Sequence, residues 1–224
     1  MRQFPELGYA ITPQVLSENE CNQLLRELSS WETGRSRAGV RHLMSCPAVS
    51  SVARDQRLQV LALEALGELP TPYRATLFEK SGDSNWLVAW HQDTALPLTT
   101  QFMSPEWGPW SHKSGITYAH APAWALERIV TLRIHLDPCG QDNGPLRVLP
   151  GTHRKGILTN SEISILAKDE PFTECLVPQG GILVMKPLVL HASSRARKDA
   201  PRRVVHIEYA PASGLPEKIQ LAVA

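Results

Sequence analysis

The sequence predicts a mainly β protein with flanking helices, folded as a β-sandwich or jelly roll. Two observations indicate this class. After residue 72, short apolar runs typical of strands are separated by turns at intervals of roughly 8 to 12 residues. Before that point, apolar residues recur at helical spacing in two segments. We therefore expect the last two thirds of the chain to form the β-sheets and the helices to pack on the outside of them.

The first elements are a short strand and an amphipathic helix. Residues 9–11 are apolar and end near Pro13, which favours a strand. Ser17 and Glu20 have the spacing of a capping box, and this predicts a helix over 18–30. Its apolar face consists of Cys21, Leu24, Leu25 and Leu28.

Residues 34–41 form a basic, glycine-containing segment that predicts a loop, and one or two helices are expected over 47–67. Asp55 is a candidate N-cap within that region, and Gly67 is a typical helix stop signal. Either the charged side chains of this loop are simply solvated, or the loop brings Arg41 to an anionic substrate.

The second part of the chain reads as a series of strands. The segment 129–136 is the clearest, with Arg133 and His135 on one face and Leu132 and Ile134 on the other. A small helix is expected over 161–167. The other expected strands are 73–78 and 86–91, joined by a polar turn at 81–84, then 146–149, 182–185, 188–191 and 203–209.

Residues 94–122 show no pattern of regular structure and are rich in proline, glycine, serine and aromatic residues. Such long segments are usually disordered or functional, and the tryptophans argue against disorder. We therefore expect a lid-like insertion that folds over a site, or else a packing excursion that covers the sheet. The whole of 1–224 is expected to be one domain.

Composition excludes several classes of protein. The 23 basic and 22 acidic residues nearly cancel, so no strong field points to nucleic acid or to an anionic membrane. No apolar run has the length of a signal peptide or a membrane span. The four cysteines are widely spaced, which favours reduced thiols in the cytoplasm over a zinc ribbon or disulfide framework.

One motif near the middle of the chain carries the chemistry. His91 and Asp93 are two residues apart at the end of an expected strand, so both side chains project from one face. His191 stands near the end of a later expected strand and supplies a second imidazole. Two histidines and one carboxylate are the ligand set of non-haem Fe(II) oxygenases, which leave metal positions open for cosubstrate and O2.

Such a centre needs an electron source, and an arginine-rich stretch follows His191. If the source is 2-oxoglutarate, its distal carboxylate requires a bidentate cation, for which arginine is suited. An arginine that opens the last strand, Arg202 or Arg203, and the hydroxyl of Ser193 fit this task. The length of the charged turn leaves the register open by one residue.

The ordered set of motifs resembles the phytanoyl-CoA dioxygenase family, a branch of the Fe(II)/2-oxoglutarate oxygenases, over nearly the whole chain. These motifs are Asn85-Trp86, His91-Gln92-Asp93, Asn143-Gly144-Pro145-Leu146, Pro150-Gly151-Thr152-His153, and His191-x-Ser193 with a following arginine. The resemblance implies a double-stranded β-helix, the jelly-roll fold of this family.

The resemblance also implies roles for single residues. His91, Asp93 and His191 match the iron ligands, while Arg202 and Ser193 match the contacts to the distal carboxylate of 2-oxoglutarate. Gln92 and Asn85 occupy positions that contact the cosubstrate in some relatives. The expected substrate is a small organic molecule, and the cationic side chains would suit one with an acidic group. The pocket expected for it combines aromatic and cationic residues: Arg41, Trp107, Trp110, Arg133 and His135.

The implied reaction is an oxidation with Fe(II), 2-oxoglutarate and O2, usually a hydroxylation, with release of succinate and CO2. Desaturation, cyclisation and epimerisation are alternatives at the same centre. Two other classes remain open: a non-catalytic β-helix protein that binds a small molecule or partner, and a metal-dependent hydrolase. The sequence leaves the substrate and the oligomeric state undetermined.

Overall fold

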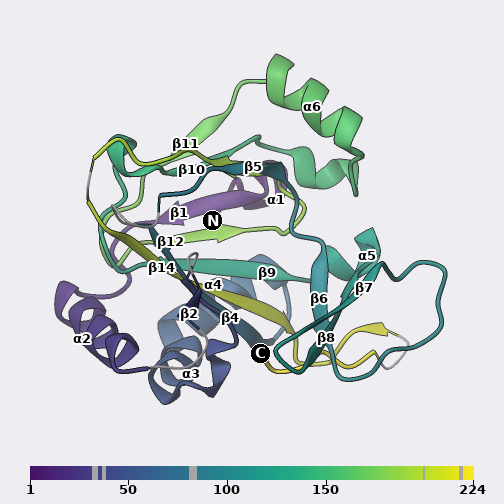
Figure 1. The fold of residues 1–224 in the computed structure, drawn as a ribbon, viewed down its shortest axis with the longest axis horizontal. Coiled ribbons are helices and arrows are strands. Elements are labelled where there is room, and N and C mark those ends of the chain that lie inside the picture. The colour runs from purple at the N-terminus through teal and green to yellow at the C-terminus, as the bar shows by residue number, and fades with distance from the viewer. Residues whose placement is uncertain (32–34, 37–38, 81–84, 199, 217–218) are drawn as a thin grey trace.

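Two facing β-sheets form the centre of the computed structural model, which describes residues 1–31, 35–36, 39–80, 85–198, 200–216 and 219–224 (Figure 1). The larger sheet has the strand order β1-β12-β9-β14-β4-β3-β2, and the smaller one has the order β11-β10-β13-β5. All the pairings between these strands are antiparallel. The jelly-roll prediction is confirmed, although the sheets do not close into a barrel.

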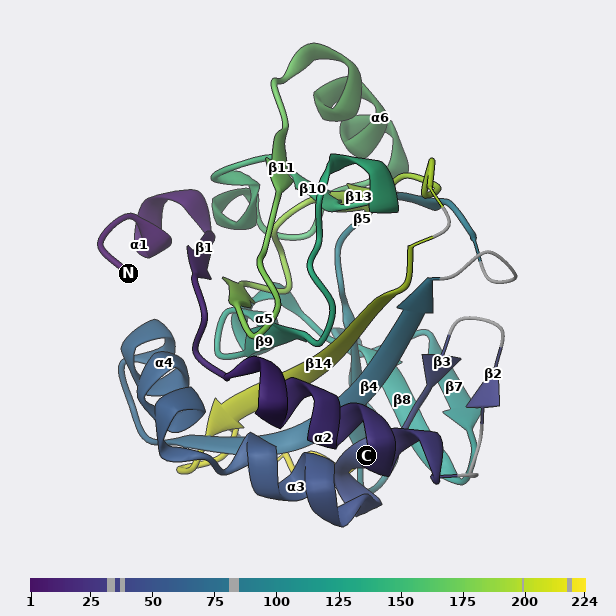
Figure 2. The same cartoon turned by 90° about the vertical axis from the view of Figure 1, so that its left-hand side faces the viewer.

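The strands of the larger sheet are β1 (Tyr9–Thr12), β2 (Arg35–Ser36), β3 (Gly39–Val40), β4 (Pro70–Lys80), β9 (Val130–His135), β12 (Ile182–Met185) and β14 (Arg202–Pro211). Those of the smaller sheet are β5 (Val88–His91), β10 (Leu146–Val148), β11 (Thr173–Cys175) and β13 (His191–Ser193). The long pair β4 and β14 crosses the middle of the molecule (Figure 2).

Three helices cover the outer face of the larger sheet: α2 (Glu18–Ser29), α3 (Pro47–Ala53) and α4 (Gln56–Leu66) (Figure 2). The capping box of Ser17 and Glu20 is present, Asp55 caps α4, and Gly67 ends it with a left-handed φ of 78°. Apolar residues from alternate positions of β4, β9 and β14 pack against these helices in the main core. The remaining helices are α1 (Phe4–Leu7), α5 (Ala123–Leu126), α6 (Asn160–Asp169) and three short 3-10 turns (Leu43–Ser45, Gln141–Asn143 and Thr152–Lys155).

The inner face of the larger sheet is unusually polar. Because side chains alternate along a strand, the residues between the core positions point toward the smaller sheet. On β9 and β14 these include Arg133, His135, Arg202, His206 and Glu208, all of them at most 6% exposed. A buried face of this composition needs hydrogen-bond or charge partners, so it indicates a functional cavity rather than a second apolar core.

The prediction of an irregular segment over 94–122 is wrong. This segment forms a third, antiparallel sheet with the order β6-β8-β7, from β6 (Ala95–Leu98), β7 (Trp110–Lys113) and β8 (Ile116–His120). This sheet lies beside α5 (Figure 1). Its buried side chains form a separate apolar cluster with those of α5 and of the adjoining ends of β4 and β14. The runs of apolar residues in this segment are short and are interrupted by proline and glycine, so the sequence shows no clear strand periodicity.

Smaller differences concern element boundaries. Two short strands, β2 and β3, lie within the expected loop 34–41. β4 begins at Pro70, earlier than the expected strand 73–78. β13 begins at His191, where the expected strand 188–191 ended. The expected turn 81–84 lies outside the described residues. The helix over 161–167 is confirmed as α6. Among the described residues, none of the helices has the length and apolar composition that crossing a membrane requires.

Candidate metal centre and cosubstrate pocket

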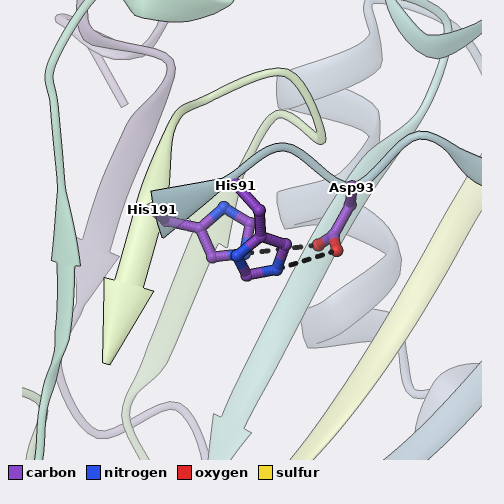
Figure 3. Close-up of side chains that lie close together, drawn as sticks. All are labelled: His91, Asp93 and His191. Carbon is purple, nitrogen blue, oxygen red and sulfur yellow. Dashed lines mark ion pairs between the residues drawn. The ribbon is translucent and has the colours of Figure 1, made fainter. Parts of the chain in front are cut away.

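Two strands of the smaller sheet bring the predicted metal ligands together. His91, the last residue of β5, and His191, the first of β13, are direct partners in the antiparallel ladder. Asp93 follows β5 immediately, and its backbone N–H donates to the carbonyl of Pro187 at 3.0 Å. One ligand atom from each of the three side chains lies within 4.8 Å of the others (Figure 3).

Both imidazoles are held in the tautomer that suits a metal ligand. The Nδ1 atoms of His91 and His191 each lie 2.8 Å from the backbone carbonyl two residues earlier, of Ala89 and Val189. A carbonyl accepts only, so Nδ1 carries the hydrogen and Nε2 is left with a free lone pair. These Nε2 atoms face Asp93, at 3.6 Å from Oδ1 for His91 and 3.5 Å from Oδ2 for His191 (Figure 3).

The protonation states also suit metal binding. Burial lowers the pKa of His191 to about 4, against the opposing effect of Asp93, so this imidazole is neutral near pH 7. Burial would raise the pKa of Asp93, but the two neighbouring histidines outweigh it and hold the pKa below its ordinary range. The side chains of His91 and Asp93 are 40% and 38% exposed, and that of His191 only 4%, so the centre opens on one side.

These donors fit a divalent iron. Two neutral nitrogens and one carboxylate oxygen on adjacent positions occupy one face of an octahedron and leave the other positions open. No cysteine belongs to the group, which makes a structural zinc site a poorer match to the donor set.

A cavity beside the three ligands contains the residues predicted for the cosubstrate. Arg202, which is 3% exposed, and Ser193 line it together with Phe78, Trp86, Val88 and Leu146. Within the described part of the chain, Nε and Nη1 of Arg202 have no hydrogen-bond partner. The guanidinium has a hydrogen bond with Cys139, and because burying its other two nitrogens without acceptors costs free energy, its presence here fits a bound carboxylate.

Lys80 is a buried amine, hydrogen-bonded to the lining residue Ser193, that the sequence reasoning missed. It is the direct cross-strand partner of Arg202 and is 1% exposed, and its Nζ donates to Ser193 Oγ at 2.7 Å. Burial, assisted by the charge of Arg202, lowers the pKa of Lys80 to about 7. Its position at the end of an expected strand was visible, but the strand register that sets it beside Arg202 was not.

The structure separates the two candidate arginines. Arg203 points away from the cavity and forms a bidentate ion pair with Asp137, with Nε to Oδ2 at 2.8 Å and Nη2 to Oδ1 at 2.7 Å. Arg202, on the opposite face of the strand, lines the cavity. The geometry therefore favours Arg202 as the carboxylate partner.

Gln92 and Asn85 do not line this cavity, contrary to expectation. The amide of Gln92 donates to the carbonyls of Gly156 and Leu188 and accepts from the N–H of Leu158. Asn85 exchanges two hydrogen bonds with the backbone of Ala196. Both side chains are thus occupied in fixing loops around the site, since alternation turns Gln92 away from its neighbours His91 and Asp93.

The five residues suggested for substrate binding also separate. Arg133 lines the cavity beside the metal ligands. Trp107 is buried in an aromatic cluster with Phe102 and Trp124, and Trp110 packs on Phe102; neither lines the cavity. Arg41 is exposed on the loop after β3, outside the cavity. The insertion therefore uses its tryptophans for its own core.

His135 is buried but does not line the cavity either. Within the described residues, neither of its ring nitrogens has a hydrogen-bond partner. Burial, together with the charges of Arg133 and Arg202, holds its pKa well below the ordinary value, so the ring is neutral.

Comparison with known proteins agrees with this geometry. The chain shares its fold with EctD from S. alaskensis, at 19% identity and a TM-score of 0.71 over 97% of this chain and 78% of that one. It also shares its fold with the α-ketoglutarate-dependent carbocyclase SnoK from nogalamycin biosynthesis, at 16% identity and a TM-score of 0.70 over 94% of this chain and 83% of that one. A third structure with this fold is HygX from Streptomyces hygroscopicus with nickel and 2-oxoglutarate bound, at 15% identity and a TM-score of 0.67 over 94% of this chain and 85% of that one. No curated protein matches the chain in sequence.

The sequence profile of one family covers most of the chain. Residues 4–204 match the family described as phytanoyl-CoA dioxygenase (PhyH), and this span contains the three predicted metal ligands and Arg202. The chain therefore belongs to the phytanoyl-CoA dioxygenase family and is an Fe(II)- and 2-oxoglutarate-dependent oxygenase.

Proposed function

We propose that this oxygenase hydroxylates a small organic molecule, with release of succinate and CO2 from 2-oxoglutarate. One observation carries the proposal: the facing nitrogens of His91 and His191 and the carboxylate of Asp93 converge beside the guanidinium of Arg202, two of whose nitrogens have no hydrogen-bond partner among the described residues. A metal site and a carboxylate site in one cavity are what the cosubstrate requires.

The chain's own residues divide the task as follows. His91, Asp93 and His191 hold the iron, and the backbone carbonyls behind the two histidines fix the ring orientation. Arg202 binds the distal carboxylate of 2-oxoglutarate through its guanidinium, and Ser193, whose hydroxyl donates to the carbonyl of Gly144 at 3.0 Å, lines the pocket beside it. When bound, the iron with 2-oxoglutarate and O2 supplies the oxidising power.

Lys80 and the apolar walls complete the pocket. Lys80 donates to Ser193 and adds positive charge near Arg202, which favours a dianionic cosubstrate. Phe78, Val88 and Leu146 line the cavity and exclude water from it, so these charges act in a low dielectric.

The open side of the centre is where the substrate approaches. His91 and Asp93 are exposed there, whereas His191 and Arg202 are buried behind them. A substrate bound over His91 and Asp93 reaches the iron without crossing the cosubstrate pocket. Hydroxylation is the proposed outcome; cyclisation is the specific alternative, because SnoK, which shares the fold, is a carbocyclase.

We further propose that residues 1–224 act as one oxygenase domain in the cytoplasm. The four cysteines are all free and buried, which supports a reducing compartment.

The proposal is tested by anaerobic titration of the protein with Fe(II) and then 2-oxoglutarate. We expect a weak visible charge-transfer band that saturates at one equivalent of each, and succinate formation once O2 and substrate are supplied. Asp93→Ala should abolish the band, and Arg203→Gln should retain it. A non-catalytic binding protein would give no band, and a hydrolase would turn over with Zn(II) in the absence of O2; either result overturns the proposal.

A further inference from the structure

Arg133 is a buried cation that lines the active-site cavity, and it has no proposed role in binding the metal or the cosubstrate. It lies on the inner face of β9, is 6% exposed, and lines the same cavity as His91, Asp93 and His191. Its guanidinium carbon lies 5.3 Å from the centre of the Phe78 ring, which supports one face of the group.

Only one of its three nitrogens has a hydrogen-bond partner among the described residues. Nη1 lies 2.8 Å from Nδ1 of His206, the direct cross-strand partner of Arg133. Since a guanidinium only donates, Nδ1 of His206 accepts, and its Nε2–H donates to Glu208 at 3.2 Å. The Nε–Nη2 edge of Arg133 therefore remains available, and this edge has the fork geometry that matches a carboxylate.

Arg74 shows by contrast what a satisfied arginine looks like on the same sheet face. Its Nη1 lies 3.2 Å from the carboxylate of Glu208, so its charge is neutralised within the protein. Arg133 has no carboxylate within 4.0 Å in the part of the chain that is described, and the nearest one on the cavity wall is the candidate metal ligand Asp93. Its hydrogen-bond partner among the described residues is a histidine, and the Asp93 carboxylate compensates its charge only from beyond ion-pair distance.

The charges of the cavity point to an anionic occupant besides 2-oxoglutarate. Arg133 and Arg202 line a cavity in which Asp93 is the only carboxylate among the described lining residues, and Lys80, which does not line it, donates to the lining residue Ser193. Arg202 and Ser193 are the residues proposed for the distal carboxylate of 2-oxoglutarate, and the metal ligands would hold its other end. Arg133 is paired across the sheet with His206, four residues along β14 from Arg202, so the two arginines enter the cavity at different levels.

We propose that the substrate is a small carboxylate whose acidic group is bound by the Nε–Nη2 edge of Arg133 beside the metal ligands. This inference rests on the proposed function and names its substrate class. The anchored carboxylate fixes one end of the substrate on the inner face of β9, so the bond to be oxidised lies a short distance from it, toward the open side of the centre.

The test measures equilibrium binding, without turnover. The anaerobic Fe(II)–2-oxoglutarate complex is titrated with matched acid and amide pairs, propionate with propionamide and benzoate with benzamide, at constant ionic strength in a carboxylate-free buffer. Saturation-transfer NMR gives the Kd of each probe. In the wild type at least one acid should bind ten-fold or more tightly than its amide. Arg133→Gln should remove this preference while the Kd of 2-oxoglutarate changes by less than three-fold.

Arg54→Gln is the matched control, because it removes one positive charge from an exposed site at the end of α3. It should keep the acid preference. Equal binding of acids and amides to the wild type, or no acid binding up to 100 mM, overturns the inference, and this comparison remains decisive even if the Gln variant does not fold. A ten-fold weaker Kd for 2-oxoglutarate in Arg133→Gln would assign the arginine to the cosubstrate instead. Failure of the proposed function is a separate result, since then no charge-transfer band forms before any probe is added.

Discussion

His91 and His191 lie directly opposite each other on adjacent antiparallel strands, with ring centres 4.3 Å apart. Directly opposed residues share one face of a sheet, so the two imidazoles are positioned by the hydrogen-bonding register of β5 and β13. A shift of one residue in that register would turn His191 to the other face and dismantle the group. The metal geometry is therefore as rigid as the smaller sheet itself.

Asp93→Ala should abolish metal-dependent stabilisation of the protein. Loss of the carboxylate leaves two neutral ligands, which bind a divalent ion weakly. We expect Ni(II), added at about one hundred times the wild-type Kd, to stabilise the wild type by about 2.7 kcal/mol. In the variant the melting temperature should not respond. Asp142→Ala, which removes a carboxylate paired with Lys198 at the surface, is the control and should respond as the wild type does. An equal response in Asp93→Ala would contradict the assignment.

Arg202→Ala and Arg203→Ala should have opposite consequences. Arg202→Ala removes the cavity guanidinium and should weaken 2-oxoglutarate binding by about a hundred-fold, the equivalent of about 2.7 kcal/mol, at unchanged metal affinity. Arg203→Ala should leave that Kd unchanged and lower the free energy of unfolding by about 1 kcal/mol, through loss of the pair with Asp137. The charge-transfer titration measures the Kd of 2-oxoglutarate, and urea unfolding measures the stability. Weaker 2-oxoglutarate binding in Arg203→Ala, with unchanged binding in Arg202→Ala, would assign the distal carboxylate to Arg203 instead.

Lys80→Met should stabilise the protein while impairing cosubstrate binding. Below pH 7 the amine is protonated in both the folded and the unfolded chain, and burial of its charge opposes folding in full. Between pH 7 and its ordinary pKa of 10.5 the folded protein releases the proton, so wild-type stability should rise with pH over this window. At pH 7 the free energy of unfolding of the variant should exceed that of the wild type by about 1 to 3 kcal/mol. Its stability should not rise between pH 7 and 9, and it should bind 2-oxoglutarate more weakly than the wild type. Urea unfolding at pH 7 and 9 checks this; a less stable variant would contradict it.

The metal ligands could be predicted from sequence because their signal is local. His91 and Asp93 are two residues apart on an extended segment, so the alternation of a strand already places them on one side. His191 needed only to return to the same sheet, as distant strands do in a jelly roll. The helix of Ser17 and Glu20 was predictable for the same reason, because capping and spacing act within one turn.

The parts that sequence missed depend on pairing between distant strands. The proximity of Lys80 to Arg202 follows from the register of β4 and β14, which no local pattern encodes. Trp107 was assigned to a lid because its segment lacks periodicity, yet it is buried by contacts with Phe102 and Trp124. Gln92 was assigned to the cosubstrate by the family resemblance, but its partners come from a distant loop.

Gln92→Ala should affect stability rather than cosubstrate affinity. The substitution leaves the part-buried N–H of Leu158 and carbonyl of Gly156 and the buried carbonyl of Leu188 without their partners, which should cost about 2 kcal/mol. The Kd of 2-oxoglutarate at saturating Fe(II) should stay within two-fold of the wild type. Urea unfolding and the anaerobic titration separate the effects. Unchanged stability with ten-fold weaker cosubstrate binding would return Gln92 to the pocket.

Trp107→Ala should destabilise the protein by about 4 kcal/mol, because it empties the centre of the cluster that joins the third sheet to α5 and to the ends of β4 and β14. Trp107 is 5% exposed and makes edge contacts to Phe102 and Trp124 at 5.5 and 6.1 Å between ring centres, so neighbouring side chains cannot readily fill the space. Met103→Ala, a fully exposed change in the same segment, should alter the free energy of unfolding by less than about 0.5 kcal/mol. Both are measured by urea unfolding. If Trp107→Ala kept wild-type stability and lost only substrate binding, the tryptophan would belong to a lid over the site. Since its ring is held between Phe102 of the same segment and Trp124 of α5, we expect the loss of stability.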